Sequence, residues 1–366
     1  MQQAAQPRID AIDILRGLAL ALMLLVNNPG SWSAVYAPFL HASWHGLTPT
    51  DLVFPFFLFV VGASMACSLK GQIQNSGMPW LSVFKRGALL FLIGFVLQIA
   101  PFDQAPDTWR IMGVLQRIGL CFVLVATIIA IVKERYLLLT CALVLLAYWL
   151  LFATSGELPY SIENTVVRHF DMAMLGSNHM WHVSGLPFDP EGLLSTIGAS
   201  VTVLSGYLIC SSTLQNKSHK KQIIDLILIG CALLGLGLLW SIWQPINKSL
   251  WTGSFVLVCS AAACLCLAII IWLWSVLQIK TGLNALKIYG SNPIVIYVAA
   301  WLFAVFLRRV NLTFNEQSNS IQGWVYASFQ TVMPDKLASL VYALIFTLIF
   351  YFIALILYKK RIFIKL

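Results

Sequence analysis

Charged residues are scarce in this sequence. Only 10% of its 366 residues are Asp, Glu, Lys or Arg, whereas 59% are hydrophobic and the mean hydropathy is +0.83. A soluble domain of this length needs more charge, so that class is excluded. Several uncharged runs reach the roughly 18 to 25 residues that a helix needs to cross a hydrocarbon core. They lack the period-two alternation of barrel strands. The sequence therefore predicts an all-α, polytopic integral membrane protein.

The uncharged runs predict about ten transmembrane helices in a single domain over 1–366, because no linker is long enough to separate two domains. The ten predicted spans are 14–30, 51–69, 87–102, 111–132, 136–153, 192–211, 223–241, 250–276, 288–307 and 338–358. No cleavable signal peptide is evident, since Arg8, Asp10, Asp13 and Arg16 interrupt the first run. We expect that run to remain as the first helix.

Motifs for disulfide and metal chemistry are missing. The eight cysteines all fall within predicted spans, and no CxxC pair occurs. His41 and His45, and likewise His179 and His182, have spacings that zinc tolerates. A loop does not hold such pairs on one face, however, and no carboxylate stands at ligand spacing, so we expect no metal. A neutral imidazole at a water-accessible membrane edge is better suited to act as a general base.

Lysine and arginine are distributed unequally between the two sides of the predicted bundle. One side, with both termini, holds 15 of the 23 cations, and the other side holds six. The positive-inside rule places the richer side in the cytoplasm. The outer loops are then 29–50, a possible lid at 154–191, and a polar segment at 308–337 that is typical of a solvated loop. The net charge of +9 is thus a topology signal in the lipid bilayer, and no nucleic-acid binding is expected.

Two outer loops carry signals for the start of a helix. In "LTPTDLVFP", Thr48 is the predicted N-cap, with Pro49 at the first helical position and Asp51 at the third. In "FDPEGLLST", Asp189 is the predicted cap of the sixth span. Two roles are then open for Asp51, Asp189 and Glu191. They either only stabilise the starts of helices, or they belong to helix N-termini that present N–H groups to an anion.

Four polar residues within predicted spans are candidates for a functional role, because ionisable groups cost about 2.5 to 3.5 kcal/mol at a helix centre. Arg16 is either a snorkelling anchor with a nearby aspartate or a cavity residue. Gln116 and Arg117 lie well inside the fourth span, where a cavity or phosphate role is favoured for the arginine. Asn292, before a proline, indicates either a kink with internal hydrogen bonds or a ligand contact. Outside the spans, Lys248 is either a plain loop lysine or meets the anionic part of a ligand.

Six segments together resemble the heparan-α-glucosaminide N-acetyltransferase family and its bacterial homologues. They are "RIDAIDILRGLALALMLLVNNPG", "HASWHGLTPTDLVFPFFLFVVGAS", "RIMGVLQRIGL", "FDPEGLLSTIGA", "PINKSLWTGSFVL" and "ILYKKRIFIKL". The pattern HxxWxGLTxxDLVFP is highly specific, and GVLQR is moderately so. The lysosomal enzyme has an additional amino-terminal lumenal domain and helix, so this chain resembles the bare ten-helix core.

The resemblance implies transfer of acetyl from cytosolic acetyl-CoA to the amine of a glucosamine-like sugar on the far side of a membrane. It implies that His41 is the active-site histidine and Asn27 the active-site asparagine. His45 stands where the compared family member has asparagine, so we expect it at most to tune His41. The resemblance also implies a homodimer, here in a bacterial inner membrane. Acetyl-CoA carries phosphates that need cations or helix N-termini. The candidate residues for binding it are Arg16, Gln116, Arg117, Lys248 and Asn292.

Two alternatives stay open. One keeps the fold and the reaction but changes the acceptor, for example to a cell-wall sugar or a hydroxyl group. The other is a secondary transporter of sugars or cell-wall fragments, with Arg117 and Asn292 contacting the substrate. No internal repeat is apparent, but inverted repeats persist without visible identity. A transporter moves labelled sugar without acetyl-CoA, whereas the enzyme consumes thioester.

Overall fold

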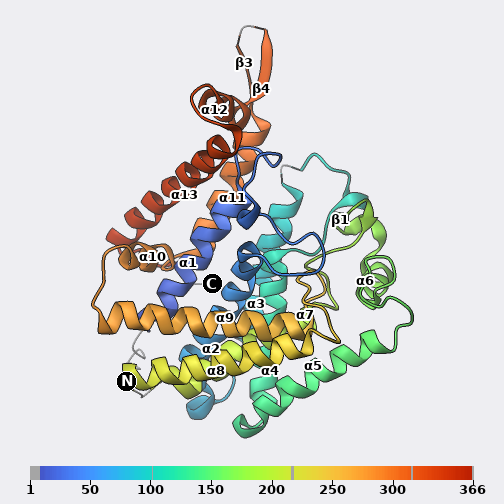
Figure 1. Ribbon diagram of the computed structural model, residues 1–366, viewed down its shortest axis with the longest axis vertical. Coiled ribbons are helices and arrows are strands. Elements are labelled where there is room, and N and C mark those ends of the chain that lie inside the picture. The colour runs from blue at the N-terminus through green and yellow to red at the C-terminus, as the bar shows by residue number, and fades with distance from the viewer. Residues whose placement is uncertain (1–8, 101, 216–217, 315, 365–366) are drawn as a thin grey trace.

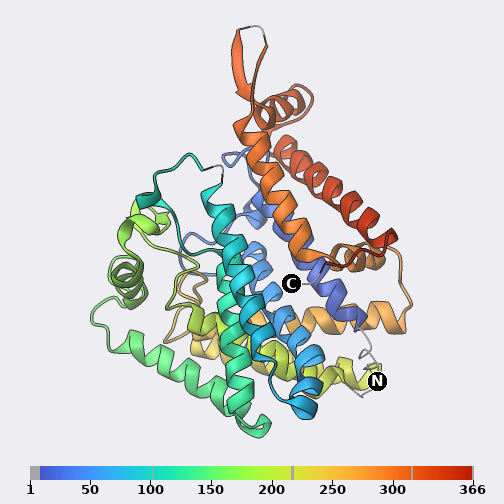
Figure 2. The same cartoon turned by 180° about the vertical axis from the view of Figure 1, so that it is seen from behind.

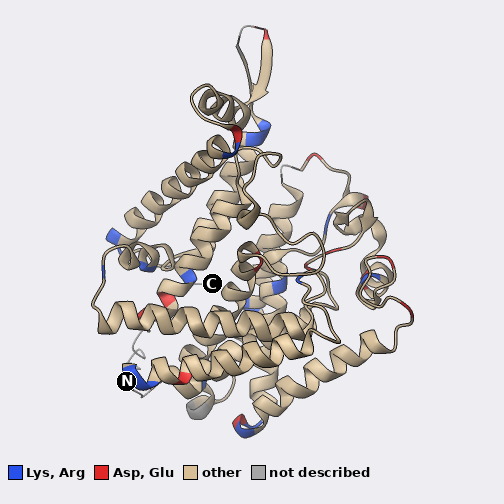
Figure 3. Ribbon diagram, viewed as in Figure 1, with Lys and Arg blue, Asp and Glu red and all other residues tan. Residues whose placement is uncertain are grey.

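The structure is a computed structural model that describes residues 9–100, 102–215, 218–314 and 316–364. Arg8, Lys217 and Lys365, which contribute to the predicted orientation, lie outside the described residues. Within them the regular secondary structure is almost entirely helix, which confirms the all-α fold class. Figure 3 shows that the charged residues gather at the ends of the helices and in the loops.

Each predicted span corresponds to helix. The long helices are α1 (Asp10–Asn27), α2 (Val53–Ser76), α3 (Trp80–Ile99), α4 (Val114–Ile131), α5 (Leu137–Ala153), α7 (Thr196–Ile209), α8 (His219–Trp240), α9 (Gly253–Ile271), α11 (Pro293–Arg309) and α13 (Asp335–Lys359). Short turns extend three of them: η2 (Pro49–Leu52) leads into α2, and the π-helical turns η6 (Cys210–Leu214) and η7 (Trp272–Val276) continue α7 and α9. The short helix α10 (Leu283–Tyr289) precedes α11.

Fewer of the described helices than the predicted ten qualify as membrane spans by length and composition. Among the described residues, eight helices are long and apolar enough to span a bilayer, and α10 with α11 makes a ninth if the pair counts as one span bent by 79°. The remaining helix, α1, is 18 residues long but carries Asp10, Asp13 and Arg16. The count of ten and the cytoplasmic location of both termini stay predictions.

Two segments that the sequence predicts to be outer loops contain regular secondary structure. The segment 308–337 holds a hairpin of β3 (Asn311–Phe314) and β4 (Gln317–Ser320), followed by α12 (Ile321–Gln330), so its prediction as a solvated loop is wrong. Figure 1 shows this hairpin projecting from the bundle. The segment 154–191 holds α6 (Val166–Leu175) and a short hairpin of β1 (His182–Val183) and β2 (Leu186–Pro187). The polar composition of the segment 308–337 predicts that it is exposed, but composition does not show that two of its strands pair through hydrogen bonds.

The helices pack closely where glycines face a neighbouring backbone. A Cβ atom added at Gly62 of α2 would lie 1.7 Å from the Val203 carbonyl oxygen of α7, and one at Gly206 would lie 2.0 Å from that of Phe59. At Gly17 of α1 it would lie 1.7 Å from the Leu286 oxygen of α10. Small residues of this kind let membrane helices approach each other. They fix α1 against α10 and α2 against α7.

The bundle has two groups of helices. Figure 1 shows α8 and α9 side by side along one edge, with α2, α4 and α7 behind them, while α10, α11 and α13 lie together on the other side. Figure 2 shows α3 beside α4 from behind. Helix α1 contacts both groups, since it packs against α2 and α9 and also against α10 and α13. Helix α1 also contacts η2, the turn that follows the predicted histidine loop.

Candidate active site

Two loops meet at the end of the bundle where α1 ends and α2 begins. Gly46 donates its backbone N–H to the Ile246 carbonyl at 2.8 Å. Asn247 donates its side-chain amide to the Trp44 carbonyl at 2.9 Å and accepts from the Leu250 N–H at 2.8 Å. Asn247 is fully buried, so these bonds hold both loops in one conformation. The loop before α2 and the turn before α9, about 200 residues apart, form one structure.

His41, Asp51 and Lys248 form the centre of this structure. The His41 Nδ1 lies 2.7 Å from Asp51 Oδ1, and the Lys248 Nζ lies 3.0 Å from the same nitrogen and 3.4 Å from the same oxygen. The His41 side chain is 46% exposed, whereas Asp51 is 1% exposed. A carboxylate only accepts hydrogen bonds, so Nδ1 carries the proton. Nε2 then keeps a lone pair that can accept a proton, and the Lys248 Nζ lies 3.4 Å from it.

Asp51 is held in place by its neighbours. Its Oδ2 accepts from the backbone N–H groups of Thr48 at 3.0 Å and Ala42 at 3.1 Å, and from the Thr48 hydroxyl at 2.9 Å. The bond to the Thr48 N–H is the predicted capping interaction, which is therefore confirmed. The other oxygen orients His41. Asp51 thus both starts the helix and orients His41, a role that the sequence did not predict for it.

Lys248 is the predicted ligand candidate that the structure places at His41. Burial lowers the pKa of Lys248, and the carboxylates of Asp51 and Glu191 only partly offset this. A lysine held between a carboxylate and an imidazole is a positive charge directed at the place where a reacting group would meet Nε2. The turn that carries it begins α9 and is fixed by Asn247.

His45 has different surroundings from His41. Its Nδ1 lies 3.2 Å from the Asn247 amide nitrogen, and its ring is tilted against Trp44 at a centroid distance of 6.1 Å. Burial lowers the pKa of His45. Among the described residues it has no hydrogen bond to Asp51 or Lys248. His45 therefore supports the loop, and His41 is the histidine with a charged partner.

A second polar cluster lies beside the first. Arg110 makes two hydrogen bonds to Asp189, at 2.8 and 2.7 Å, and one to Glu191 at 2.7 Å. Burial alone would lower the pKa of Arg110, but the two carboxylates raise it above its usual value. Arg110 in turn keeps the pKa of Glu191 low despite burial. The prediction that Asp189 caps the sixth span is wrong, because α7 begins at Thr196 and the fully buried Asp189 pairs with Arg110 instead.

Arg117 lies closer to the end of its helix than predicted. It is the fourth residue of α4, hence in the first turn and not well inside the span. It is fully buried and donates to the Gly192 carbonyl at 3.0 Å and to the Ser195 hydroxyl, and its guanidinium lies 5.1 Å from the centre of the Trp251 ring. Its Nε and Nη1 groups have no hydrogen-bond partner among the described residues. Through Trp251 it belongs to the same end of the bundle as Lys248.

Asp171 of α6 lies near Arg117 on the other side of Gly192. Its Oδ1 accepts from the Leu194 N–H at 3.0 Å, and its Oδ2 is buried without a hydrogen-bond partner among the described residues. A Cβ atom on Gly192 would lie 1.8 Å from Oδ2, so glycine is required there. Burial raises the pKa of Asp171 to about 6, although Arg117 acts in the opposite direction.

Arg16 and Asn292 lie at the opposite end of α1 from this site. Arg16 pairs with Asp13 and donates to the Ser64 hydroxyl at 2.6 Å and the Gly290 carbonyl at 3.3 Å. At 1.5 Å per residue, Arg16 and Asn27 are about 16 Å apart along α1. Asn292, at the bend between α10 and α11, donates to the Ile362 carbonyl and accepts from the Ile364 N–H. The alternative of a kink with internal hydrogen bonds is therefore confirmed.

The other two predicted residues do not contact His41. Gln116 is buried in α4 beside Gly94 of α3 and donates to the Ile111 carbonyl at 3.0 Å. Asn27 is exposed at the end of α1, and its side chain makes no hydrogen bond among the described residues. The sequence did not single out Asn247, Arg110 or Asp171. For Asp51 it contained a signal, because the residue stands in the same specific motif as His41.

The fold and this site define a polytopic helical membrane protein with a histidine, an aspartate and a lysine in contact at one end of its bundle. Residues 8–176 match the family model described as heparan-alpha-glucosaminide N-acetyltransferase, catalytic. The chain is 28% identical to human heparan-alpha-glucosaminide N-acetyltransferase over 99% of its length, and 26% identical to the mouse protein over all of it. It spans 60% and 61% of the length of these relatives. The resemblance to this family is confirmed.

Proposed function

We propose that the protein is a membrane acetyltransferase that passes acetyl from acetyl-CoA to the amine of an amino sugar on the opposite, periplasmic side of a bacterial inner membrane. One observation carries the proposal: Asp51 binds His41 Nδ1 at 2.7 Å, so that Nε2, with Lys248 Nζ 3.4 Å away, keeps a lone pair, and both residues lie within the segment that matches the N-acetyltransferase family. A base is needed there because the ammonium group of an amino sugar has to lose a proton before it attacks a thioester.

The reaction then proceeds with His41 Nε2 accepting a proton from the acceptor's ammonium group. The amine attacks the thioester carbon, a C–N bond forms, and the carbonyl oxygen becomes an oxyanion. When the intermediate collapses, the C–S bond breaks and the thiolate of CoA leaves. The thiolate takes the extra proton of the amide nitrogen, and the imidazolium of His41 afterwards releases its own proton to water. Asp51 stabilises the imidazolium that forms meanwhile. An acetyl group carried transiently on Nε2 is the alternative route.

Positive charge and amide donors near Nε2 stabilise the oxyanion. Lys248 is 3.0 Å from the imidazole and supplies a cation that is already in place. Asn27 ends the helix that contacts η2, and we propose that its amide supplies the second donor. Each such donor is typically worth about 10²–10³ in rate.

The donor's nucleotide belongs at the opposite end of α1. We propose that Arg16, with the lysines and arginines of the inner loops, meets the CoA phosphates, so that the pantetheine arm extends along the helices toward His41. Arg117 and Lys248 lie at the His41 end, so they would meet the donor near its thioester or meet the acceptor. Gln116 and Asn292 stay candidates, although their amides already bind backbone groups.

A thioester assay tests the proposal directly. The purified protein is incubated with acetyl-CoA and a panel of amines and sugar hydroxyls, and free CoA thiol and acetylated product are both measured. We expect thiol release that depends on an amino sugar and is lost in His41→Ala. Transport of labelled sugar into proteoliposomes without acetyl-CoA would instead support the transporter, and acetylation of hydroxyls alone would change the acceptor. Mass measurement in detergent tests the proposed homodimer.

A further inference from the structure

Two cysteines of different helices meet near the end of the bundle opposite His41. Cys67 belongs to α2, and Cys210 is the first residue of η6, the π-helical turn that continues α7. Their sulphur atoms lie 3.6 Å apart, although the two residues are separated by 143 positions in the chain. Both are free thiols in the structure. No sequence motif relates these residues, so only the fold brings the two thiols together.

Helices α2 and α7 are close enough for the thiols to form a covalent bond. Gly62 of α2 faces a carbonyl of α7, and Gly206 of α7 faces a carbonyl of α2, so the two backbones meet with no side chain between them. A disulfide has an S–S distance of about 2.05 Å, so the two sulphurs have to approach by about 1.5 Å. Because the helices are already in contact, this approach requires only a small movement.

The two thiols differ in exposure. Cys67 is partly exposed, whereas Cys210 is fully buried. One turn after Cys67, the Lys70 Nζ lies 2.6 Å from the exposed Glu134 carboxylate, and such a charged pair belongs at the aqueous boundary of a membrane protein. A small oxidant dissolved in water can therefore reach Cys67, and Cys210 is the second thiol beside it. Redox-sensing cysteines often have this arrangement of an accessible thiol next to a resolving one.

Hydrogen peroxide is an oxidant that fits this pair. The Cys67 sulphur attacks one peroxide oxygen, the O–O bond breaks, and a sulfenic acid and one water form. The Cys210 sulphur then attacks the Cys67 sulphur, so that the S–S bond forms, the S–O bond breaks, and the hydroxide takes the Cys210 proton and leaves as a second water. Two thiols thus lose two electrons to one peroxide. Exchange with a thiol reductant reverses the reaction.

The cysteine pair lies beside a contact of Arg16. The Arg16 Nη2 donates to the Ser64 hydroxyl at 2.6 Å, and Ser64 and Cys67 are three residues apart on α2, hence neighbours on one side of the helix. Helix α2 packs against both α1 and α7. A bond that draws α2 toward α7 therefore displaces Ser64 relative to Arg16, at the end of the bundle where we place the CoA phosphates.

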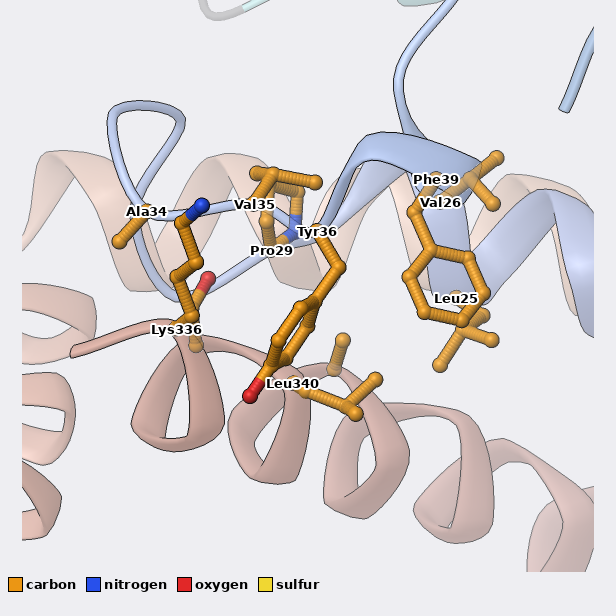
Figure 4. A pocket seen from close by; sticks show the side chains of 11 residues that line it. Leu25, Val26, Pro29, Ala34, Val35, Tyr36, Phe39, Lys336 and Leu340 are labelled. Atoms are coloured by element: carbon orange, nitrogen blue, oxygen red, sulfur yellow. The ribbon is translucent and has the colours of Figure 1, made fainter. Parts of the chain in front are cut away.

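The His41 end of the bundle is held by separate contacts. There the Gly30 N–H of the loop after α1 donates to the Ser339 carbonyl of α13 at 3.2 Å, and Figure 4 shows the Tyr36 ring reaching from the same loop to α13. Cys67 is about 21 Å along α2 from Val53, its first residue, at a rise of about 1.5 Å per residue. We therefore expect a link between Cys67 and Cys210 to leave the surroundings of His41 unchanged.

We propose that Cys67 and Cys210 form a reversible disulfide on reaction with a peroxide, and that this disulfide weakens the binding of acetyl-CoA at the Arg16 end of the bundle. A transient, regulatory role agrees with the rarity of structural disulfides in reducing compartments. The effect on acetyl-CoA rests on the proposed acetyltransferase function, whereas formation of the disulfide does not.

The test uses the full chain, reduced, purified in detergent and treated with hydrogen peroxide, which is removed before measurement. Digestion without reductant should give a linked peptide that contains Cys67 and Cys210. We expect the Kd for acetyl-CoA to rise about tenfold on oxidation, since one hydrogen bond to a charged group is worth roughly that factor, and to return on treatment with dithiothreitol. Turnover at saturating acetyl-CoA should not change, because the His41 site is not altered.

Substitutions identify the thiols that are responsible. Cys67→Ser should abolish both the linked peptide and the rise in Kd. Cys231→Ser, at an exposed cysteine of α8, is the matched control and should leave both in place. Cys210→Ser should behave like Cys67→Ser. If the variant at this buried position does not fold, Cys67→Ser, at a partly exposed position, decides alone.

Three results would overturn the inference: no linked peptide in the oxidised protein, a linked protein whose Kd for acetyl-CoA equals that of the reduced protein, or an equal rise in Kd in Cys67→Ser. Each of these leaves the proposed function intact, because the reduced protein still binds acetyl-CoA. If the reduced protein neither binds acetyl-CoA nor releases thiol from it, the proposed function itself fails, and the linked peptide still shows whether the disulfide forms.

Discussion

Replacing Asp51 with asparagine changes one oxygen of a buried side chain to an amide nitrogen and keeps its shape. In the native protein, three donors converge on Oδ2: the N–H groups of Thr48 and Ala42 and the Thr48 hydroxyl. The single oxygen of the asparagine has to occupy that position, because an amide nitrogen there would face three donors. The NH₂ group is then directed at His41 Nδ1.

This orientation gives His41 the wrong tautomer. An NH₂ group donates, so Nδ1 becomes the acceptor and the proton moves to Nε2, which can no longer act as a base. The substitution also removes the charge that stabilises the imidazolium and the anion that lies 3.4 Å from Lys248. In the serine protease triad, the corresponding change lowers kcat by about 10⁴, and losing a general base typically costs about 10²–10⁴. We expect Asp51→Asn to lose roughly 10²–10⁴ in turnover.

The assay is the release of CoA thiol by purified protein in the presence of the amino-sugar acceptor, together with acetyl-CoA binding and thermal unfolding. Acetyl-CoA binding should be nearly unchanged, because the proposed nucleotide site is at the other end of α1. Thr48→Val is the matched control: it removes one of the three donors but leaves the carboxylate and its bond to His41. If Asp51→Asn protein that folds and binds acetyl-CoA keeps more than about a tenth of the activity, the assignment of Nε2 as the base is refuted.

Four further predictions follow from the geometry. His41→Ala should abolish nearly all turnover while keeping acetyl-CoA binding. His45→Asn should stay active, because His45 contacts Asn247 and not Asp51. An inactive His45→Asn protein would contradict this. Arg117→Ala should impair ligand binding or folding. Arg117→Lys should restore little, because lysine lacks the planar guanidinium that lies over Trp251 and that places Nη2 between Gly192 and Ser195; full rescue in binding and melting experiments would argue against this. Burial raises the pKa of Asp171 to about 6, so the folded state holds its proton more tightly than the unfolded chain, and this residue's contribution to stability is lost as the pH rises from about 4 to above 6. Asp171→Asn should remove that part of the pH dependence of the melting temperature. An unchanged dependence would show that Asp171 ionises normally. Single cysteines at Ser33 and Ser218 in a cysteine-free background should react with membrane-impermeant reagents from opposite sides, and labelling of both from the cytoplasm would reverse the predicted orientation.

Hydrophobic run length alone predicted the helices. Each predicted span has a helix, because crossing a hydrocarbon core demands a long uncharged segment, and this demand is visible in the local sequence. The exceptions have local causes that run length does not show. Helix α1 carries three charges, and the chain bends by 79° where Asn292 binds backbone groups of the C-terminal segment. The hairpin of β3 and β4 depends on pairing between polar strands, which composition does not show.

The sequence by itself determined the class of protein and, through one specific motif, singled out His41 as the candidate active-site histidine. Only the tertiary structure decided which groups surround that histidine. Lys248 is 207 residues away in the chain, and Asp189 is 79 residues from Arg110, so no local pattern relates them. The structure also places Arg16 and Arg117 at opposite ends of the bundle, although the cost of burying an arginine in a span had made both of them candidates for the same cofactor site. Charges buried in a membrane protein require partners, and folding places those partners where sequence spacing carries no information.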